Sequence, residues 1–485
     1  MNFKKYSFAI FIALIVVYWG TLFLNGYPEA FADDTVYVGA AIHFAEQGRI
    51  WNTLTPGLLE NFNIFPYVTF YSWLLGYWLK ILGISTIAIL AFWGFINLFF
   101  SITLTICLRR LKIPYYLIMA AILVYTAGIL EMGMRPNFFA NALFMGGLLF
   151  LSSSQRVWLG FGWMMIGLSI TTLSYMVAFA FPLGLAWIYL RYKSTAEEPF
   201  CIYKDIATVL TAAVSTLLIY GGSVEFRYLD WLEAYTRVAK LNATPFDATN
   251  WKEGWFYAWK SITNGWNLLL FGSGYLLSIV LLGVQIHQWK STPLRDRLLS
   301  IIFFMGLIFA GALYSVFLIL IIPTWTLIYV LVISHLNQQV KGTRFNRYAV
   351  QGALLAVPLA IVLKVIPFIF QTEYDPQKLA EIKSHIQNHP EKNLVISTDS
   401  WRYIFDYRAP AGTVCAEYCV PQEGRSWVAH LRTMKSKNEN DLWILSAYYM
   451  ECMIPDSQQR FTPLKAGGRT FRSIRQYRNE ILLIP

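Results

Sequence analysis

Charged residues are scarce in this chain. Only 14% of its 485 residues are Asp, Glu, Lys or Arg, whereas 56% are hydrophobic and 17% are aromatic. This composition excludes an ordinary soluble domain and indicates a helical protein that crosses a membrane many times, with a polar part attached. We find no internal repeat, heptad run or low-complexity tract, so repeat and coiled-coil architectures are not indicated.

Asp-x-Asp, a common metal-binding motif of sugar transferases, is absent as well. We predict no bound metal, and a zinc site formed by Cys415, Cys419, Cys452 and His430 is the less favoured alternative. Cysteines number five. Cys415, Cys419 and Cys452 fall near the C-terminus, where an oxidising compartment permits one disulfide among them, with Cys415–Cys419 and Cys419–Cys452 both open.

The excess of positive charge belongs to the apolar part of the chain. The net charge is +11, but the stretch from Gln371 onward is nearly balanced, so most of the excess lies in short loops between apolar runs. That pattern indicates membrane topology and contact with anionic lipid, and it argues against nucleic acid as a partner.

Apolar runs define the predicted spans. Tyr6–Pro28 is uncharged and long enough to cross a bilayer, and Lys4 and Lys5 before it keep the N-terminus in the cytoplasm. Two of the later runs, Val157–Leu190 and Leu298–Val340, are too long for one crossing, and each predicts a hairpin of two helices. The later, nearly uncharged runs are Ile81–Leu108, Ile113–Leu130, Pro136–Gln155, Val157–Leu190, Ile206–Val224, Ser261–Ile286, Leu298–Val340 and Tyr348–Thr372.

One aromatic run decides the topology. If Phe62–Leu82 lies along the interface, every short basic loop falls in the cytoplasm, so we take that option. The prediction is a polytopic α-helical protein of the plasma (inner) membrane with about eleven spans, its N-terminus inside and its C-terminus outside. Residues 1–370 form the transmembrane part, with outer loops at 29–80 and 223–260.

The polar tail, residues 371–485, is predicted to be a small extracytoplasmic α/β domain. Asn393–Thr398 and Leu442–Ala447 are short apolar runs typical of buried strands. Gln377–His389 and Gln422–Lys437 have helical patterns. A cap over the outer face is the simpler role for this domain, and binding of an acceptor is the alternative.

The most informative stretch follows the first span. Ala32-Asp33-Asp34-Thr35-Val36-Tyr37 emerges on the outer face, close to the membrane surface. A carboxylate there can reach a lipid headgroup and deprotonate a hydroxyl, as a transferase that takes sugar from a lipid carrier requires. An aspartate at this position can equally cap the amphipathic helix that follows. We expect one aspartate to serve each purpose.

Together with the short loop that carries Arg135-Pro136-Asn137, this stretch resembles the GT-C glycosyltransferases. It is most similar to the group of protein O-mannosyltransferases and lipid A aminoarabinose transferases. There the first outer loop bears an Asp-Asp or Asp-Glu pair followed by a tyrosine. The resemblance covers the first third of the chain by motif and the remainder by hydropathy and the external C-terminal domain.

The resemblance assigns roles to individual residues. Asp33 matches the family's catalytic carboxylate, Asp34 the adjacent acidic position and Tyr37 the substrate-binding tyrosine. Val36 stands where the aminoarabinose transferases often have an arginine. Asn137 stands where an aspartate is common, and Glu131 is the candidate to replace it.

The implied reaction moves a sugar, with inversion, from a polyprenyl phosphate to an acceptor hydroxyl on a glycan, lipid or protein. Asp33 is the predicted general base. The leaving phosphate needs cations, and Arg135 is the best candidate because an unpaired charge between two spans is costly. The alternative for Arg135 is a pair with Glu131, four positions earlier on one helix face.

Other candidates for substrate binding are distributed along the chain. Arg227, Arg237 and Lys240 lie among aromatic residues of the 223–260 loop, a combination that suits a phosphosugar or a simple interfacial belt. Lys364 lies inside the last apolar run, where it either binds substrate or extends to the headgroups. Glu60, in the first outer loop, could support the acceptor.

Two further classes of function compete with this one. A transporter or flippase of a lipid-linked glycan should place charges at mid-membrane and show paired halves, and neither is evident here. An enzyme similar to O-antigen ligases would use a diphosphate-linked donor and a large arginine-rich outer loop. The 223–260 loop supplies this only in part.

Overall fold

The computed structural model divides into two compact units. Unit 1 comprises Met1–Leu22, Gly94–Leu130 and Pro136–Phe370, and unit 2 comprises Phe23–Trp93, Glu131–Arg135 and Gln371–Pro485. The structure describes residues 3–28, 32–52, 62–110, 112–130, 133–151, 153, 155–173, 176, 200–241, 366, 370, 380, 383–384, 387–388, 394–396, 401–402, 405–408, 414–415, 442–446, 464–466, 469–477 and 480–484.

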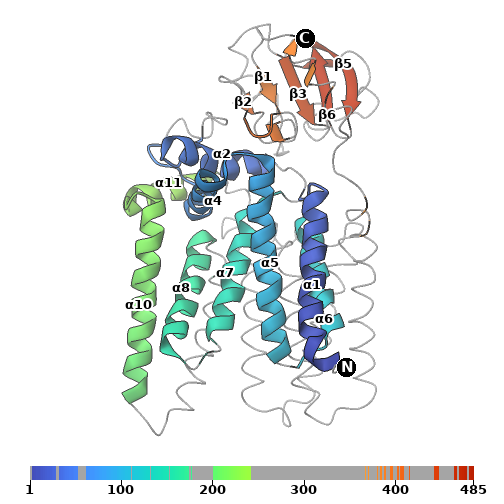
Figure 1. The fold of residues 1–485 in the computed structure, drawn as a ribbon. Coiled ribbons are helices and arrows are strands. Elements are labelled where there is room, and N and C mark those ends of the chain that lie inside the picture. The colour runs from blue at the N-terminus through green and yellow to red at the C-terminus, as the bar shows by residue number, and fades with distance from the viewer. Residues whose placement is uncertain are drawn as a thin grey trace, which may run out of the picture. The chain divides into compact units, whose positions relative to one another are not determined.

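Unit 1 is helical where it is described (Figure 1). Apolar runs of the sequence become helices, and the helix α7 starts at a proline, whose missing N–H costs nothing at a first helical position. The unit contains most of α1 (Phe3–Leu24) and α5 (Thr86–Arg110), and all of α6 (Tyr115–Ile129), α7 (Pro136–Leu151), α8 (Arg156–Thr172), α10 (Phe200–Ser223) and α11 (Tyr228–Leu241).

Small residues allow the helices of unit 1 to approach closely. A Cβ atom on Gly147 of α7 would lie 2.9 Å from the backbone oxygen of Gly162 in α8. A Cβ on Gly167 of α8 would lie 2.6 Å from the hydroxyl of Thr216 in α10. Close contact through small residues is the usual way in which helices associate in lipid, because no hydrophobic effect drives them together there.

Buried hydrogen bonds join the first helices of unit 1. The Trp19 indole of α1 donates to the Ser101 hydroxyl of α5 over 2.9 Å. The Tyr125 hydroxyl of α6 donates to the Asn97 side-chain oxygen of α5 over 2.8 Å. Such bonds satisfy polar groups that would be costly in an apolar environment and fix the pairing of the helices.

Three of the described helices are long and apolar enough to cross a membrane: Tyr6–Leu24, Thr86–Arg110 and Tyr203–Ser223. Each coincides with a predicted span. Tyr115–Thr126 and Pro136–Leu151 are shorter apolar helices. The total of about eleven spans and the inside–outside assignment stay predictions, because residues 242–365 lie outside the described part.

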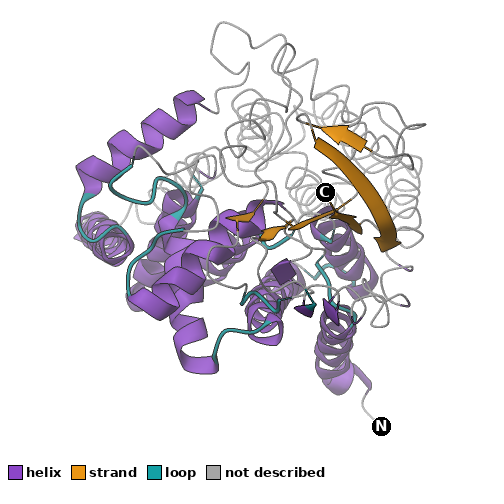
Figure 2. Cartoon of the chain, turned by 90° about the horizontal axis from the view of Figure 1, so that it is seen from above, coloured by secondary structure: helices purple, strands orange, loops and turns teal. Residues whose placement is uncertain are grey.

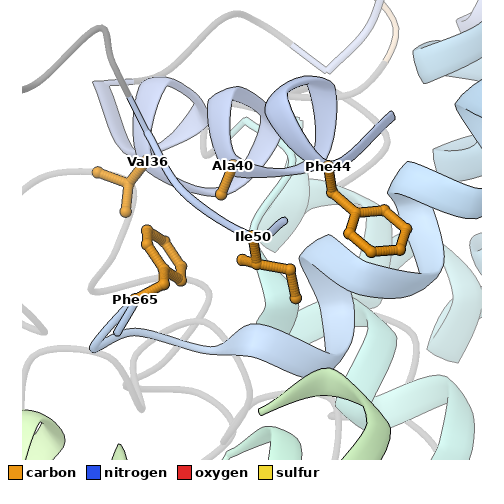
Figure 3. Close-up of a cluster of buried hydrophobic side chains, with 5 residues drawn as sticks. All are labelled: Val36, Ala40, Phe44, Ile50 and Phe65. Carbon is orange, nitrogen blue, oxygen red and sulfur yellow. The ribbon is translucent and has the colours of Figure 1, made fainter. Parts of the chain in front are cut away.

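In unit 2, two helices form a hydrophobic layer. They are α2 (Ala32–Gln47) and α4 (Thr69–Leu82), which pack on each other. Figure 3 shows side chains from one face of α2 directed toward the chain that follows it. The buried cluster in that view consists of Val36, Ala40, Phe44, Ile50 and Phe65. A helix is therefore present where the sequence predicted one, but the prediction that it is amphipathic is wrong. Every residue from Asp34 to Phe44 is buried or partly buried, the polar Asp34 and Thr35 included, so the helix is covered on several faces.

The tail in unit 2 contains a six-stranded mixed sheet in the order β2-β1-β3-β6-β5-β4 (Figure 2, orange). The strands predicted within 393–398 and 442–447 are β1 and β3, and they pair in parallel. That the tail forms a domain of its own stays a prediction. The strands are β1 (Leu394–Ile396), β2 (Val414–Cys415), β3 (Leu442–Ser446), β4 (Leu464–Ala466), β5 (Arg469–Tyr477) and β6 (Glu480–Ile484).

The contact between α2 and α4 generates the first testable prediction. A Cβ on Gly76 would lie 2.5 Å from the Phe44 ring and 2.9 Å from the Ala41 backbone oxygen. Gly76→Ala should therefore push the helices apart and lower stability by about 1–3 kcal/mol. Thermal unfolding in detergent measures the effect. Gly20→Ala is the control, because nothing lies within 4 Å of its added methyl. Equal melting temperatures for the two variants would contradict the prediction.

Candidate functional site

The aspartate pair lies in the first turn of α2. The helix begins at Ala32, so its start precedes both aspartates, and neither occupies the cap position that the capping alternative requires. Acidic residues in a first turn interact favourably with the positive end of the helix dipole. The Asp34 side chain is 0% exposed, and its Oδ1 accepts a hydrogen bond from the backbone N–H of Met134 over 2.7 Å.

This hydrogen bond joins two parts of the chain that are 100 residues apart. A buried carboxylate is costly unless polar partners compensate for lost water, and a backbone N–H is such a partner. Gly133, with φ of 64°, allows the chain to turn just before Met134. The structure thus brings together the two motifs that the sequence singled out, the Asp33–Asp34 pair and the loop carrying Arg135.

Arg135 is buried, with only 7% of its surface exposed. Helix α6 ends at Ile129 and α7 begins at Pro136, so Arg135 occupies the connection between them. A pair with Glu131 on one helix face is therefore wrong, since no helix contains both positions. The Glu131 side chain itself lies outside the described residues.

Asn137 belongs to unit 1 and lies in the first turn of α7, where its side chain is also buried. Its match to the acidic position of the family, and any part in binding substrate, stay predictions.

Tyr37 lies one turn after the aspartates and is partly buried. Its ring meets that of Tyr71 edge to face, with ring centres 6.4 Å apart, and its backbone oxygen accepts a hydrogen bond from the Ser72 hydroxyl over 2.9 Å. Burial raises the pKa of Tyr71 well above its ordinary value, and the negative charge of Asp34 raises it further. Tyr71 is therefore a neutral hydroxyl beside the acidic turn.

Asn52 is a site residue that sequence reasoning missed. Its side chain is 1% exposed, and its Nδ2 donates to the backbone oxygen of Thr35 over 2.6 Å. A Cβ on Gly39 would approach the Asn52 side chain to 3.1 Å, so the glycine makes room for this contact. A glycine inside an amphipathic helix is the signal that could have indicated the close approach.

The remaining candidates are less centrally placed or lie outside the described part. Arg227, just before α11, donates from Nε to Asp230 Oδ2 over 2.7 Å in a half-exposed pair. Partly exposed pairs of this kind contribute little to stability. Arg237 and Lys240 lie in α11, but their side chains, and that of Asp33, are not among those described. Glu60 and Lys364 lie outside the described residues.

Among the described residues, no group of three or more His, Cys, Asp or Glu side chains could hold a metal ion. The described site contains a buried carboxyl group, a buried guanidinium and a buried tyrosine, groups that can bind anions and hold protons.

Comparison with known proteins concerns the fold. No family model matches the sequence, and no curated protein matches it. Among solved structures, ArnT from Cupriavidus metallidurans in the apo state aligns with 98% of this chain and 97% of its own, with a TM-score of 0.50 and 12% identity. The chain has the GT-C fold.

Two further structures resemble the chain. ArnT from Cupriavidus metallidurans bound to undecaprenyl phosphate covers 100% of this chain and 98% of its own, with a TM-score of 0.49 and 12% identity. The second is the archaeal oligosaccharyltransferase AglB from Archaeoglobus fulgidus, in complex with an inhibitory peptide and a dolichol-phosphate. The alignment covers 100% of this chain and 77% of AglB, with a TM-score of 0.47 and 12% identity. The GT-C fold is the one that the sequence resemblance implied.

The raised pKa of Tyr71 predicts a change of stability with pH. The pKa of Tyr71 in the folded protein exceeds the unfolded value of 10.0. The stability that depends on its neutral hydroxyl is therefore fully present below this pH and is lost as the pH rises toward the folded-state pKa. Tyr71→Phe should reduce the fall in stability between about pH 9 and 11 by up to ~1.4 kcal/mol per pH unit. Melting temperatures across this range measure it, and an unchanged pH dependence would contradict the assignment.

Proposed function

We propose that this chain is an inverting glycosyltransferase that moves a sugar from a polyprenyl-phosphate donor to an acceptor hydroxyl on the outer face of the plasma membrane. The observation that carries the proposal is the 2.7 Å hydrogen bond between Met134 N–H and Asp34, which connects the acidic first turn of α2 to the loop bearing Arg135. The GT-C fold supports the same reaction class.

Asp33 is the proposed general base. Asp34 is buried and bonded to the Met134 amide, which suits a positioning role. Adjacent positions in an α-helix are about 100° apart around its axis, which places the two aspartates on different faces of α2. The helix cap expected of one aspartate is replaced in this proposal by the bond from Asp34 to the Met134 amide.

The reaction is a single displacement. The acceptor oxygen attacks the anomeric carbon while Asp33 takes the hydroxyl proton. The bond between that carbon and the phosphate oxygen breaks, and the lipid phosphate leaves with the electron pair. Attack from the face opposite the leaving group inverts the configuration at the anomeric carbon.

Arg135 is proposed to stabilise the leaving phosphate. A guanidinium can donate two parallel hydrogen bonds to phosphate oxygens, and its charge acts most strongly where water is excluded. Arg135 is buried and adjoins the residue whose amide holds Asp34. Tyr37, Asn137 and the cations Arg227, Arg237, Lys240 and Lys364 are proposed to complete the binding of the phosphosugar, with Glu60 and Glu131 on the acceptor side.

A polyprenyl phosphate is the proposed donor carrier. ArnT, whose apo structure has the fold of this chain, has also been solved bound to undecaprenyl phosphate. Helices long enough to span a bilayer, together with basic loops predicted to be cytoplasmic, favour a multi-pass protein of the inner membrane whose site faces outward. The acceptor is a glycan, lipid or protein hydroxyl.

Substituting the two aspartates separately tests the proposal. Asp33→Asn removes the base and should lower kcat for transfer from a labelled polyprenyl-phosphate sugar by about 10²- to 10⁴-fold, with the melting temperature preserved. Near-normal turnover by the folded variant would reject the role assigned to Asp33.

Asp34 provides matched controls for that experiment. In Asp34→Asn, an amide oxygen can still accept the Met134 N–H, so the fall in kcat should be much smaller. Asp34→Ala lacks any acceptor and should lose about 1–3 kcal/mol of stability. In a parallel assay, we expect the enzyme not to transfer sugar from a diphosphate-linked donor. Movement of the lipid-linked substrate across the membrane without a glycosidic product would indicate a transporter instead.

Arg135 generates a separate prediction. Arg135→Gln removes the cation that faces the developing charge and should lower kcat by about 10²- to 10³-fold. Arg135→Lys should recover part of the rate, because it keeps the charge but not the two-pronged geometry. Steady-state kinetics in detergent measure both. Arg156→Gln, an exposed cation on the predicted cytoplasmic side, is the control. A fall in rate equal to that of the control would contradict the role.

A further inference from the structure

The tail carries a buried arginine for which the proposed reaction has no use. Arg402 is 1% exposed and is among the largest fully buried side chains of the described residues. Burying a guanidinium is costly unless hydrogen bonds replace its water. Its Nη1 donates to the Pro28 backbone oxygen over 2.5 Å, and its Nη2 donates to that of Gly26.

These two acceptors lie at the entry to the acidic helix. α1 ends at Leu24 and α2 begins at Ala32, so Gly26 and Pro28 belong to the connection that leads directly to Asp33 and Asp34. A guanidinium is planar and rigid, and bonds to two carbonyls of one connection fix both the position and the direction of that chain.

The segment around Arg402 is itself anchored at a second place. The Asp406 carboxylate accepts the backbone N–H of Thr86 over 2.6 Å. Arg408 donates to the Ile84 backbone oxygen from Nε over 2.9 Å and from Nη2 over 2.6 Å. Arg402 thus binds the chain before α2, and Asp406 and Arg408 bind the turn between α4 and α5. Helix α4 in turn packs on α2.

Two buried rings pack on each other within this segment of the tail. Trp401 and Tyr407 pack edge to face with ring centres 4.8 Å apart, and both are buried. Tyr407 lies near enough to Tyr71 to influence the ionisation of its hydroxyl, as does Asp34. The tail therefore reaches the same buried neighbourhood as the Asp34 carboxylate.

We propose that Arg402 is a positioning residue for the transfer reaction. Its hydrogen bonds to Gly26 and Pro28 fix the position of the first turn of α2, which carries Asp33 and Asp34. This inference rests on the proposed function for its kinetic part only. The tail then contributes to the active site by fixing the entry to α2, in addition to any role as a cover or an acceptor-binding surface.

Arg402→Lys tests the proposal, because lysine keeps the charge but cannot bond two carbonyls in a fixed geometry. Backbone hydrogen exchange in the first turn of α2, residues 33–37, should become faster. Arg408→Lys is the matched control from the same segment. It should speed exchange at residues 84–88 and leave the first turn of α2 at the wild-type rate.

Kinetics supply the second readout. In Arg402→Lys, kcat per folded molecule should fall by about 10- to 100-fold, since small displacements of a catalytic group have effects of this size. The KM for the polyprenyl-phosphate sugar and the acidic limb of the pH profile should stay near wild type. If Arg402→Lys does not fold, Arg402→Gln replaces it in both measurements.

The outcomes are separable. Wild-type exchange in the first turn of α2 of the Arg402 variant would overturn the inference, whatever the activity, and so would faster exchange throughout the protein. Faster local exchange with unchanged kcat per folded molecule would reduce Arg402 to a structural role and reject positioning. Absence of transfer by the wild-type protein would overturn the proposed function, while the exchange result would still test the contact.

Discussion

The hydrogen bond from the Met134 amide to the buried Asp34 carboxylate is the contact on which the proposed site depends. It joins the helix that follows the first apolar span to the connection between α6 and α7. It thereby brings the Asp33–Asp34 pair of α2 next to the connection that carries Arg135. A carboxyl group placed out of water needs hydrogen-bond partners in place of water, and the Met134 amide is one of them.

Three kinds of contact keep the acidic turn in place. Helix α2 packs on α4, where Gly76 permits the close approach. Asn52 bonds the Thr35 oxygen from the loop that follows α2. Arg402, from the tail, bonds the chain that precedes α2. Because these contacts come from distant parts of the sequence, the position of the turn is determined by the folded unit and not by α2 alone.

Three deeply buried residues hold the site through hydrogen bonds to backbone groups. Asp34, Asn52 and Arg402 are almost wholly buried and bond backbone groups. Residues of this kind fix geometry without taking part in chemistry, and a transferase requires such fixation because its base must stand within hydrogen-bond reach of the acceptor hydroxyl. In this proposal Asp33 and Arg135 provide the chemistry.

The sequence by itself determined the helical membrane character, a helix at the aspartates and two strands of the tail, because these follow from local composition and periodicity. The GT-C resemblance rested on the short motifs around Asp33 and Arg135. The tertiary structure alone decided that Asp34 meets Met134, that no helix pairs Glu131 with Arg135, and that Asn52 and Arg402 support the acidic turn. These facts depend on hydrogen bonds to backbone atoms far away in the chain. Every residue has the same backbone groups, so no sequence pattern marks such partners.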